Sequence, residues 1–178
     1  MAEVGYAAFS AREVARRIGY SVSTVLNVTG GNDNLVMQVN TRTFSKWADA
    51  LERALEMDPK DRIRSLVNAY FDFAEGNRRL WMAIYDHKPE GMSIPDEQAE
   101  TRGRLTGIVA REVGQSLPDM PDDQIGALSR SLIACVHGHC ALHLSGSLAL
   151  MGEADPRGQA LARVRDSLLV ARNEPLPS

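Results

Sequence analysis

The chain has 178 residues, of which 44% are hydrophobic and 24% charged, and its formal net charge is −3. This length can bury a substantial core, and the composition is that of a globular domain rather than a disordered or fibrous one. The negative balance argues against a protein that coats nucleic acid indiscriminately. Two cysteines do not make a secreted disulfide framework. With no signal peptide and no stretch of roughly 20 apolar residues, we expect a cytoplasmic protein without a membrane partner.

Residues 10–34 carry the most informative pattern, two short helices joined by a glycine turn. Ser10 and Glu13 form a capping box, in which the hydroxyl accepts from the Glu13 amide and the carboxylate reaches back to the Ser10 amide. Gly19 ends the first helix because a residue without a Cβ enters the left-handed conformation easily. Ser21 then starts a second helix. This arrangement predicts a helix-turn-helix that enters the major groove of DNA.

The charges in this region are consistent with DNA binding. Residues 10–47 hold five basic and two acidic side chains, a balance of +3 that leaves −6 for the rest of the chain. A small basic head on an acidic body suits a protein whose head alone meets phosphates. Arg12, Arg16 and Arg17 are either phosphate contacts or a solvated helix face.

Helical periodicity continues through the rest of the chain. We expect helices over about 34–56, 80–87 and about 96–117, and one unbroken helix over 122–150. A further helix is expected to start at Asp58-Pro59, with Pro at the first helical position, and a last one is expected to be capped by Asp155-Pro156. Residues 88–97 are predicted to form a loop and 174–178 a frayed tail. The predicted fold is all-α, with a DNA-binding domain at 1–47 and a helical domain for ligand binding and dimerisation at 48–178.

The motif SAREVARRIGYSVST, with this order of elements, resembles the TetR family of bacterial transcriptional regulators. The segments LNV, VNTRTF, RRLWMAIYDHKPEG and VHG (136–138) are similar to a subgroup with a C-terminal WHG domain. The resemblance implies a homodimer that binds double-stranded operator DNA and releases it when a small-molecule effector enters the body. It also implies that Ser21, Ser23, Thr24, Asn27 and Asn32 face DNA, with Arg12 beside them.

The chain departs from the family pattern in the head. The family usually has aromatic residues where Leu26 and Thr29 stand and a lysine where Asn32 stands. Losing that lysine removes about one released counterion from the salt dependence of binding. The chain begins at Met1 where the family has most of a first helix, so we expect either a truncated first helix or a start upstream.

The body offers candidate ligand-binding residues: Phe71, Trp81, Met82, Tyr85, Ile108 and His137. Aromatic residues at helical spacing are usually core, but the resemblance favours a pocket, in which Tyr85, His87 or His137 would supply the polar contact.

The segment CVHGHCALH also invites a metal or catalytic interpretation. Cys135, His139 and His143 share one helical stripe, but the first and last stand about 12 Å apart along the axis. Zinc ligands lie only about 2 Å from the metal, so we predict neither a metal nor a cofactor. With no acid–base pair and no loop for an oxyanion, the protein is not predicted to be an enzyme.

The sequence therefore predicts a DNA-binding transcriptional regulator, a ligand-responsive repressor that acts as a homodimer on a palindromic operator. The alternative is a relative that does not bind DNA, a helical dimer with an incomplete head that binds a small ligand or a protein.

Overall fold

The structure is a computed structural model that describes residues 1–87 and 96–173, and within these residues it contains helices and no strand. The helices are α1 (Ala11–Ile18), α2 (Val22–Thr29), α3 (Asn32–Met57), α4 (Arg62–Gly76), α5 (Arg78–Asp86), α6 (Asp96–Ser116), α7 (Asp122–Ser145), α8 (Ser147–Leu150) and α9 (Pro156–Asn173). The predicted all-α class is confirmed. Residues 88–95 of the predicted loop over 88–97 and the tail at 174–178 lie outside the described residues, while residues 96 and 97 belong to α6.

The chain forms two compact units. The head unit comprises Met1–Lys46 and Asn77–Arg102, and the body unit comprises Trp47–Gly76 and Gly103–Ser178. The first boundary lies one residue from the predicted one, whereas the sequence-based division left residues 77–102 with the C-terminal domain. They join the head unit because α5 contacts the first half of α3. Asn40 donates to the Ala83 carbonyl (3.4 Å), and His87 lies 3.5 Å from Asp33.

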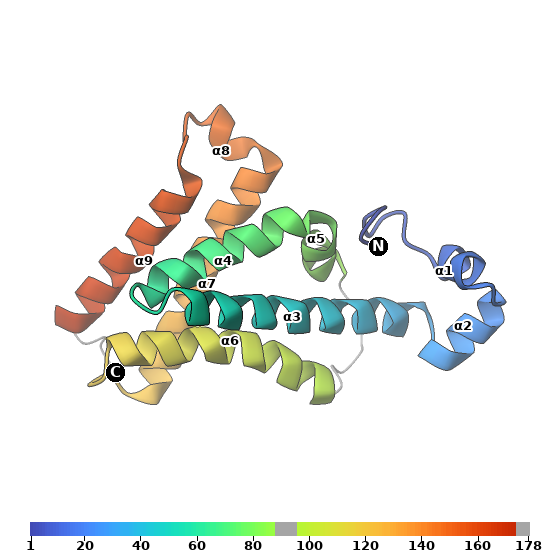
Figure 1. Ribbon diagram of the computed structural model, residues 1–178, viewed down its shortest axis with the longest axis horizontal. Coiled ribbons are helices and arrows are strands. Elements are labelled where there is room, and N and C mark those ends of the chain that lie inside the picture. The colour runs from blue at the N-terminus through green and yellow to red at the C-terminus, as the bar shows by residue number, and fades with distance from the viewer. Residues whose placement is uncertain (88–95, 174–178) are drawn as a thin grey trace. The chain divides into compact units, whose positions relative to one another are not determined.

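Local capping defines α1 and α2, which are joined by the short turn visible in Figure 1. Ser10 accepts from the Glu13 amide (3.3 Å), and Ser21 accepts from the Thr24 amide (3.1 Å). Gly19 adopts φ +74° and donates its amide to the Ala15 carbonyl. The predicted return contact of the capping box is replaced, since the Glu13 carboxylate instead accepts from arginines one turn further along α1.

A very small apolar core holds α1 against α2. It consists of Ala11, Ala15 and Val25, with Val14, Leu26 and Leu35 partly buried around it. Alanine side chains let the two helices approach closely, so few apolar atoms are needed to fix their orientation. The α3 helix follows at once after Gly30 and Gly31, both of which adopt positive φ.

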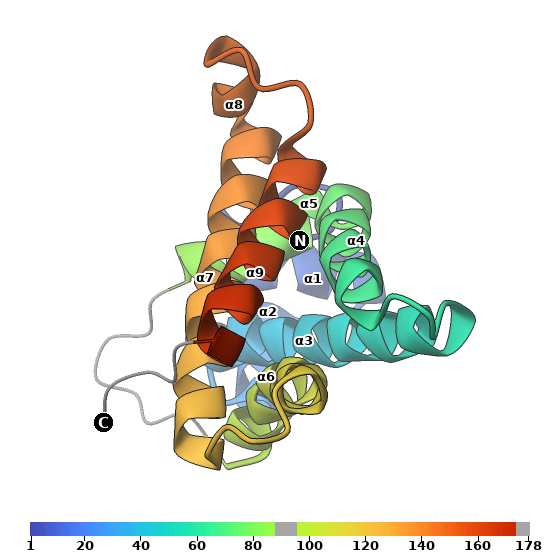
Figure 2. The same cartoon turned by 90° about the vertical axis from the view of Figure 1, so that its left-hand side faces the viewer.

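The body unit is a helical bundle in which α4, α7 and α9 pack on one another (Figure 2). Aromatic residues fill its centre. The Trp47 ring stacks on Phe73 with ring centroids 5.3 Å apart and meets Tyr70 edge-on at 4.7 Å. Leu132, Val136 and Cys140 supply the buried side of α7. Among the described helices, α7 alone is long and apolar enough by composition to cross a membrane, and a core helix of a bundle has the same composition.

Two predicted boundaries in the body unit were wrong, while a third was confirmed. The fourth helix begins at Arg62 rather than at Pro59, because Asp61 acts as the cap and accepts from the Arg64 amide (3.2 Å). The predicted unbroken helix over 122–150 ends at Ser145, since Gly146 adopts φ +81° and α8 starts after it. The predicted cap of α9 is confirmed, because Asp155 accepts from the Gly158 amide (2.9 Å).

A buried carboxylate ties α4 to α6 inside the body unit. The Glu112 side chain is 1% exposed and accepts from Arg62 at 2.5 and 2.8 Å. Arg111 also donates to it at 2.9 Å. The hydrogen bonds from Arg62 are the main reason why the pKa of Glu112 is lowered; burial opposes the shift and Arg111 adds to it. A carboxylate held in this way stabilises the fold only while it is ionised.

We predict that Glu112→Gln lowers the free energy of unfolding by on the order of 2 kcal/mol, because the buried carboxylate becomes a neutral amide and the half-buried Arg62 guanidinium loses its counter-charge. In the native protein this contribution is fully present above the ordinary glutamate pKa of 4.5 and is lost as the pH falls through the lower folded-state value. Urea unfolding between pH 7 and pH 3 measures both effects. Glu52→Gln, at a more exposed partner of Arg111, is the control and should cost less. Equal losses for the two variants would contradict the assignment.

We predict that Ser21→Ala weakens the start of α2 by about 1 kcal/mol, because the Thr24 amide loses its acceptor. Hydrogen exchange of the amides at the start of α2 should then be several-fold faster. Ser23→Ala is the matched control, since among the described residues the Ser23 hydroxyl bonds only to the Ser21 hydroxyl (2.8 Å) and caps no amide. If both variants exchange alike, Ser21 is not the cap on which α2 depends.

Candidate nucleic-acid interface

The side of α2 that faces away from α1 is a polar surface with one apolar residue. Val25 is buried and Leu26 half-buried, whereas Ser23, Thr24, Asn27 and Val28 are exposed. Ser23 and Asn27 lie on the side of the helix opposite to Val25, and Thr24 and Val28, one turn apart from each other, form the flank beside them. This side of α2 has the dimensions and chemistry of a helix that can enter a major groove. Of the four, Val28 was not singled out from the sequence.

Hydroxyl groups cluster at the beginning of α2. The Ser21 hydroxyl lies 2.8 Å from the hydroxyls of both Ser23 and Thr24, and it also caps the Thr24 amide. All three side chains are exposed. Because hydroxyls both donate and accept, this cluster can turn its donors to a phosphate oxygen without leaving a buried group unsatisfied.

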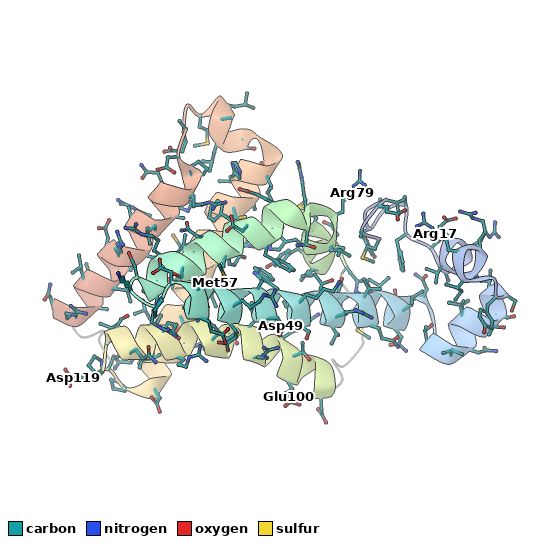
Figure 3. The ribbon with its side chains drawn as sticks, viewed as in Figure 1. Arg17, Asp49, Met57, Arg79, Glu100 and Asp119 are labelled. Carbon is teal, nitrogen blue, oxygen red and sulfur yellow. The ribbon has the colours of Figure 1, made fainter. Side chains whose placement is uncertain are left out.

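The three arginines of α1 differ in their partners. Glu13 accepts from Arg16 (2.7 Å) and from Arg17 (2.7 Å), and Arg17 also pairs with Glu3 (2.7 Å). The hydrogen bonds from Arg16 and then Arg17 lower the pKa of Glu13 to about 2. Arg17 is labelled in Figure 3, where it lies beside α1 among the side chains of the head. Arg12 is exposed, and Glu13 does not pair with it.

Asn32 is the first residue of α3 and is exposed, as a phosphate contact requires. Its neighbour in the turn, Thr29, uses its hydroxyl to donate to the Val25 carbonyl (2.9 Å). Thr29 therefore reinforces the end of α2 rather than offering a group to DNA. Each of the residues predicted to contact DNA lies exposed in the head unit: Arg12, Ser21, Ser23, Thr24, Asn27 and Asn32.

The predicted ligand-binding residues are divided between the two units. Trp81, Met82 and Tyr85 lie on α5 of the head unit, while the other three belong to the body unit. Met82 and Tyr85 are 41% and 43% exposed. Tyr85 meets the buried Trp81 edge-on, with ring centroids 5.2 Å apart.

Within the body unit, the residues predicted to bind a ligand have other surroundings. Phe71 is fully buried, and the Arg157 guanidinium covers its ring at 5.4 Å. Ile108 is buried at 3% exposure. His137 places Nδ1 3.0 Å from the Tyr70 hydroxyl, and burial lowers its pKa, which favours the neutral imidazole.

A small apolar cavity of about 40 Å³ lies inside the body unit. Its lining includes Leu51, Tyr70, Val113, Leu132 and Val164, from α3, α4, α6, α7 and α9 respectively. Phe71, Ile108 and His137 do not line it. Its one hydroxyl belongs to Tyr70, which was not among the residues predicted to bind a ligand.

The cysteines and histidines of α7 are engaged locally. His139 Nδ1 lies 2.9 Å from the Cys135 carbonyl, and His143 lies 3.2 Å from Glu75. Burial raises the pKa of Cys140 to about 12, which keeps its thiol protonated and unreactive. In the described part of the chain, no group of three or more His, Cys, Asp or Glu side chains is placed to hold a metal ion.

Comparisons with known proteins place this arrangement in a family. Residues 63–166 match the family model described as "Tetracyclin repressor-like, C-terminal domain". The "HTH-type transcriptional regulator BetI 1" of Chromohalobacter salexigens is 25% identical over 166 residues, covering 90% of this chain and 79% of that protein.

Two solved structures share the fold. A Rhodococcus protein of unknown function has a TM-score of 0.69 at 23% identity, covering 90% of this chain and 82% of that chain. PfmR, a TetR family transcriptional regulator from Thermus thermophilus, has a TM-score of 0.54 at 19% identity, covering 98% and 93%. Because the family model spans more than half of the sequence, the chain belongs to the TetR family of transcriptional regulators.

Proposed function

We propose that this protein is a repressor that binds a palindromic operator as a homodimer and releases it when a small molecule occupies the body unit. The observation that carries this proposal is the exposed side of α2, a helix whose first turn is capped by Ser21. This side presents Ser23, Thr24, Asn27 and Val28 to solvent. The "HTH-type" regulator BetI 1, which aligns with 90% of the chain, supports the same role. Because the relatives that match the chain are transcriptional regulators, we place the protein in the cytoplasm and assign it no enzymatic activity.

The head supplies two kinds of DNA contact. Arg12, the hydroxyl cluster at Ser21 and the exposed Asn32 would meet phosphates, and these contacts fix the position of the head on the duplex without reading its sequence. Asn27, near the middle of the exposed side of α2, would reach base edges. The pairing of Arg16 and Arg17 with Glu13 reduces the positive charge available to phosphates, so we expect the affinity to be modest and its dependence on salt to be shallow.

The second candidate function is a helical dimer that does not bind DNA. It is favoured by Thr29, whose hydroxyl is used within the head, and by Leu26, which is half-buried where the family usually has an aromatic phosphate contact. Such a protein would bind a small ligand or a protein through its body alone. DNA binding by the full chain decides between the two.

Dimerisation would use the exposed apolar side chains of α7 and α9, which pack together in the body unit. Leu142 on α7 is 44% exposed, and Leu169 and Val170 on α9 are 55% and 57% exposed. Gly138 lies one turn before Leu142, and a Cβ at this position would meet no atom within 4 Å. An open position among exposed apolar residues allows a second copy to approach closely.

The effector would enter the apolar cavity between α4, α7 and their neighbours. At about 40 Å³ the cavity holds no more than a few atoms, so a ligand must separate the surrounding helices in order to fit. The lining is apolar apart from the Tyr70 hydroxyl, which lies 3.0 Å from His137. We therefore expect a mainly apolar effector with one polar group that competes for this pair.

We predict that the full chain shifts a duplex drawn from the DNA flanking its own gene, and that raising the salt weakens the complex. Arg12→Ala should weaken binding to all duplexes alike and lower the slope of log K against log salt by about one, because one phosphate contact is lost. Arg53→Ala, on an exposed part of α3 in the body unit, is the control and should change neither quantity. Absence of any shift at low salt would favour the second function.

We predict that Gly138→Leu converts the dimer to a monomer without unfolding the chain, because the new side chain has room in one subunit but occupies the space of its partner. Sedimentation velocity and thermal unfolding measure the two effects. Gly107→Leu in α6 is the matched control, since a Cβ at Gly107 would also meet no atom within 4 Å, and this variant should remain dimeric. A dimer that survives Gly138→Leu would exclude this part of α7 from the interface.

A further inference from the structure

The chemistry of α2 restricts which bases it can read. From its N-cap Ser21 to its C-cap Gly30 the helix contains no arginine, lysine, aspartate or glutamate. Guanine is most often read by the paired donors of arginine or lysine, and cytosine by a carboxylate. Asparagine instead suits the N6 and N7 edge of adenine, and an apolar side chain suits the 5-methyl group of thymine. The exposed side of α2 carries one residue of each of the latter two kinds.

Val28 is the apolar residue on this side, and 81% of it is exposed. It lies one turn after Thr24 and directly after Asn27, so its isopropyl group adjoins the polar groups proposed to face DNA. The valine that packs against α1 is Val25, which is 6% exposed. Val28 therefore contributes nothing to the contact between α1 and α2, and its methyl groups are available to an outside partner.

We propose that α2 reads A·T pairs in each operator half-site, with Val28 contacting the 5-methyl group of a thymine and Asn27 bonding to the edge of a neighbouring adenine. This inference rests on the proposed function and specifies the class of base pair that the same surface recognises. It assigns to Val28 a role in specificity that differs from that of the hydroxyl cluster, because phosphate contacts are the same for every sequence.

The expected size of the effect follows from the methyl group alone. Burying one CH₂ or CH₃ group is worth about 0.8 kcal/mol, which corresponds to about a four-fold change in affinity. Deoxyuridine differs from thymidine only by this methyl group, so replacing one thymine by uracil removes the contact and leaves the hydrogen-bonding edges of the base pair unchanged.

The test begins with the full chain and a random duplex library, from which bound sequences are selected. We expect the selected half-sites to share an A·T pair. In the best duplex, each shared thymine is then replaced singly by uracil, and affinity is measured by fluorescence anisotropy at fixed salt. The unmodified protein should lose about four-fold in affinity at one thymine per half-site. Val28→Ala, which removes two methyl groups from the contact, should show a clearly smaller difference in affinity between the thymine and uracil duplexes.

Two controls separate this result from a general loss of structure. Val4→Ala makes the same change at an exposed valine outside α2, and this variant should keep the four-fold difference. Alanine is a better helix former than valine, so Val28→Ala should retain its thermal stability.

The outcomes distinguish the inference from the proposed function. Specific binding with no effect of uracil at any thymine, or an unchanged difference in Val28→Ala, would overturn the assignment of Val28 while leaving the repressor proposal standing. Half-sites whose shared pairs are all G·C would overturn it in the same way. Failure to select any duplex would remove the proposed function, and the inference with it.

Discussion

The DNA-facing surface depends on one very small contact, that of Ala11 and Ala15 on α1 with Val25 on α2. This small number of apolar atoms contributes little stability alone. The two helices therefore also depend on their N-caps, Ser10 and Ser21, and on the glycines that end them. The small side chains have a second consequence. Because α1 takes up only the Val25 side of α2, the opposite side stays open along the length of the helix. The small size of this contact therefore lowers the stability of the head and also leaves the exposed side of α2 accessible to DNA.

Charge in the head is distributed so that few cations are free for phosphates. Glu13 holds two of the three arginines of α1, and Glu3 holds one of these a second time. These exposed pairs contribute little to stability, but a phosphate must compete with a carboxylate for each guanidinium. Sequence-independent attraction is thereby kept low. A head with weak general affinity depends more on base contacts, and this is the setting in which an uncharged α2 with an exposed valine gains importance.

The sequence predicted those parts of the fold that local chemistry determines. Caps such as Ser10 and Ser21 and the stop at Gly19 involve neighbouring residues only, so their outcome does not depend on the rest of the chain. The sequence did not show which glycine ends α7. Gly138 remains helical, whereas Gly146 adopts φ +81° and ends the helix. Periodicity marked Phe71 as inward-facing but could not tell a core position under Arg157 from a cavity wall. Val28 was not singled out from the sequence, because it lies three residues after Val25 on a flank of the same helix, where spacing alone does not show that it is 81% exposed.

The central claim is that α2, held by this small contact, enters the major groove with its open side toward the bases. A crystal structure of the chain bound to a selected duplex tests it directly. The account predicts that α2 of each subunit lies in successive major grooves about one helical turn apart, roughly 34 Å, with Asn27 and Val28 at base edges. A complex in which α2 lies outside the groove, or in which another element of the chain makes the base contacts, would contradict it.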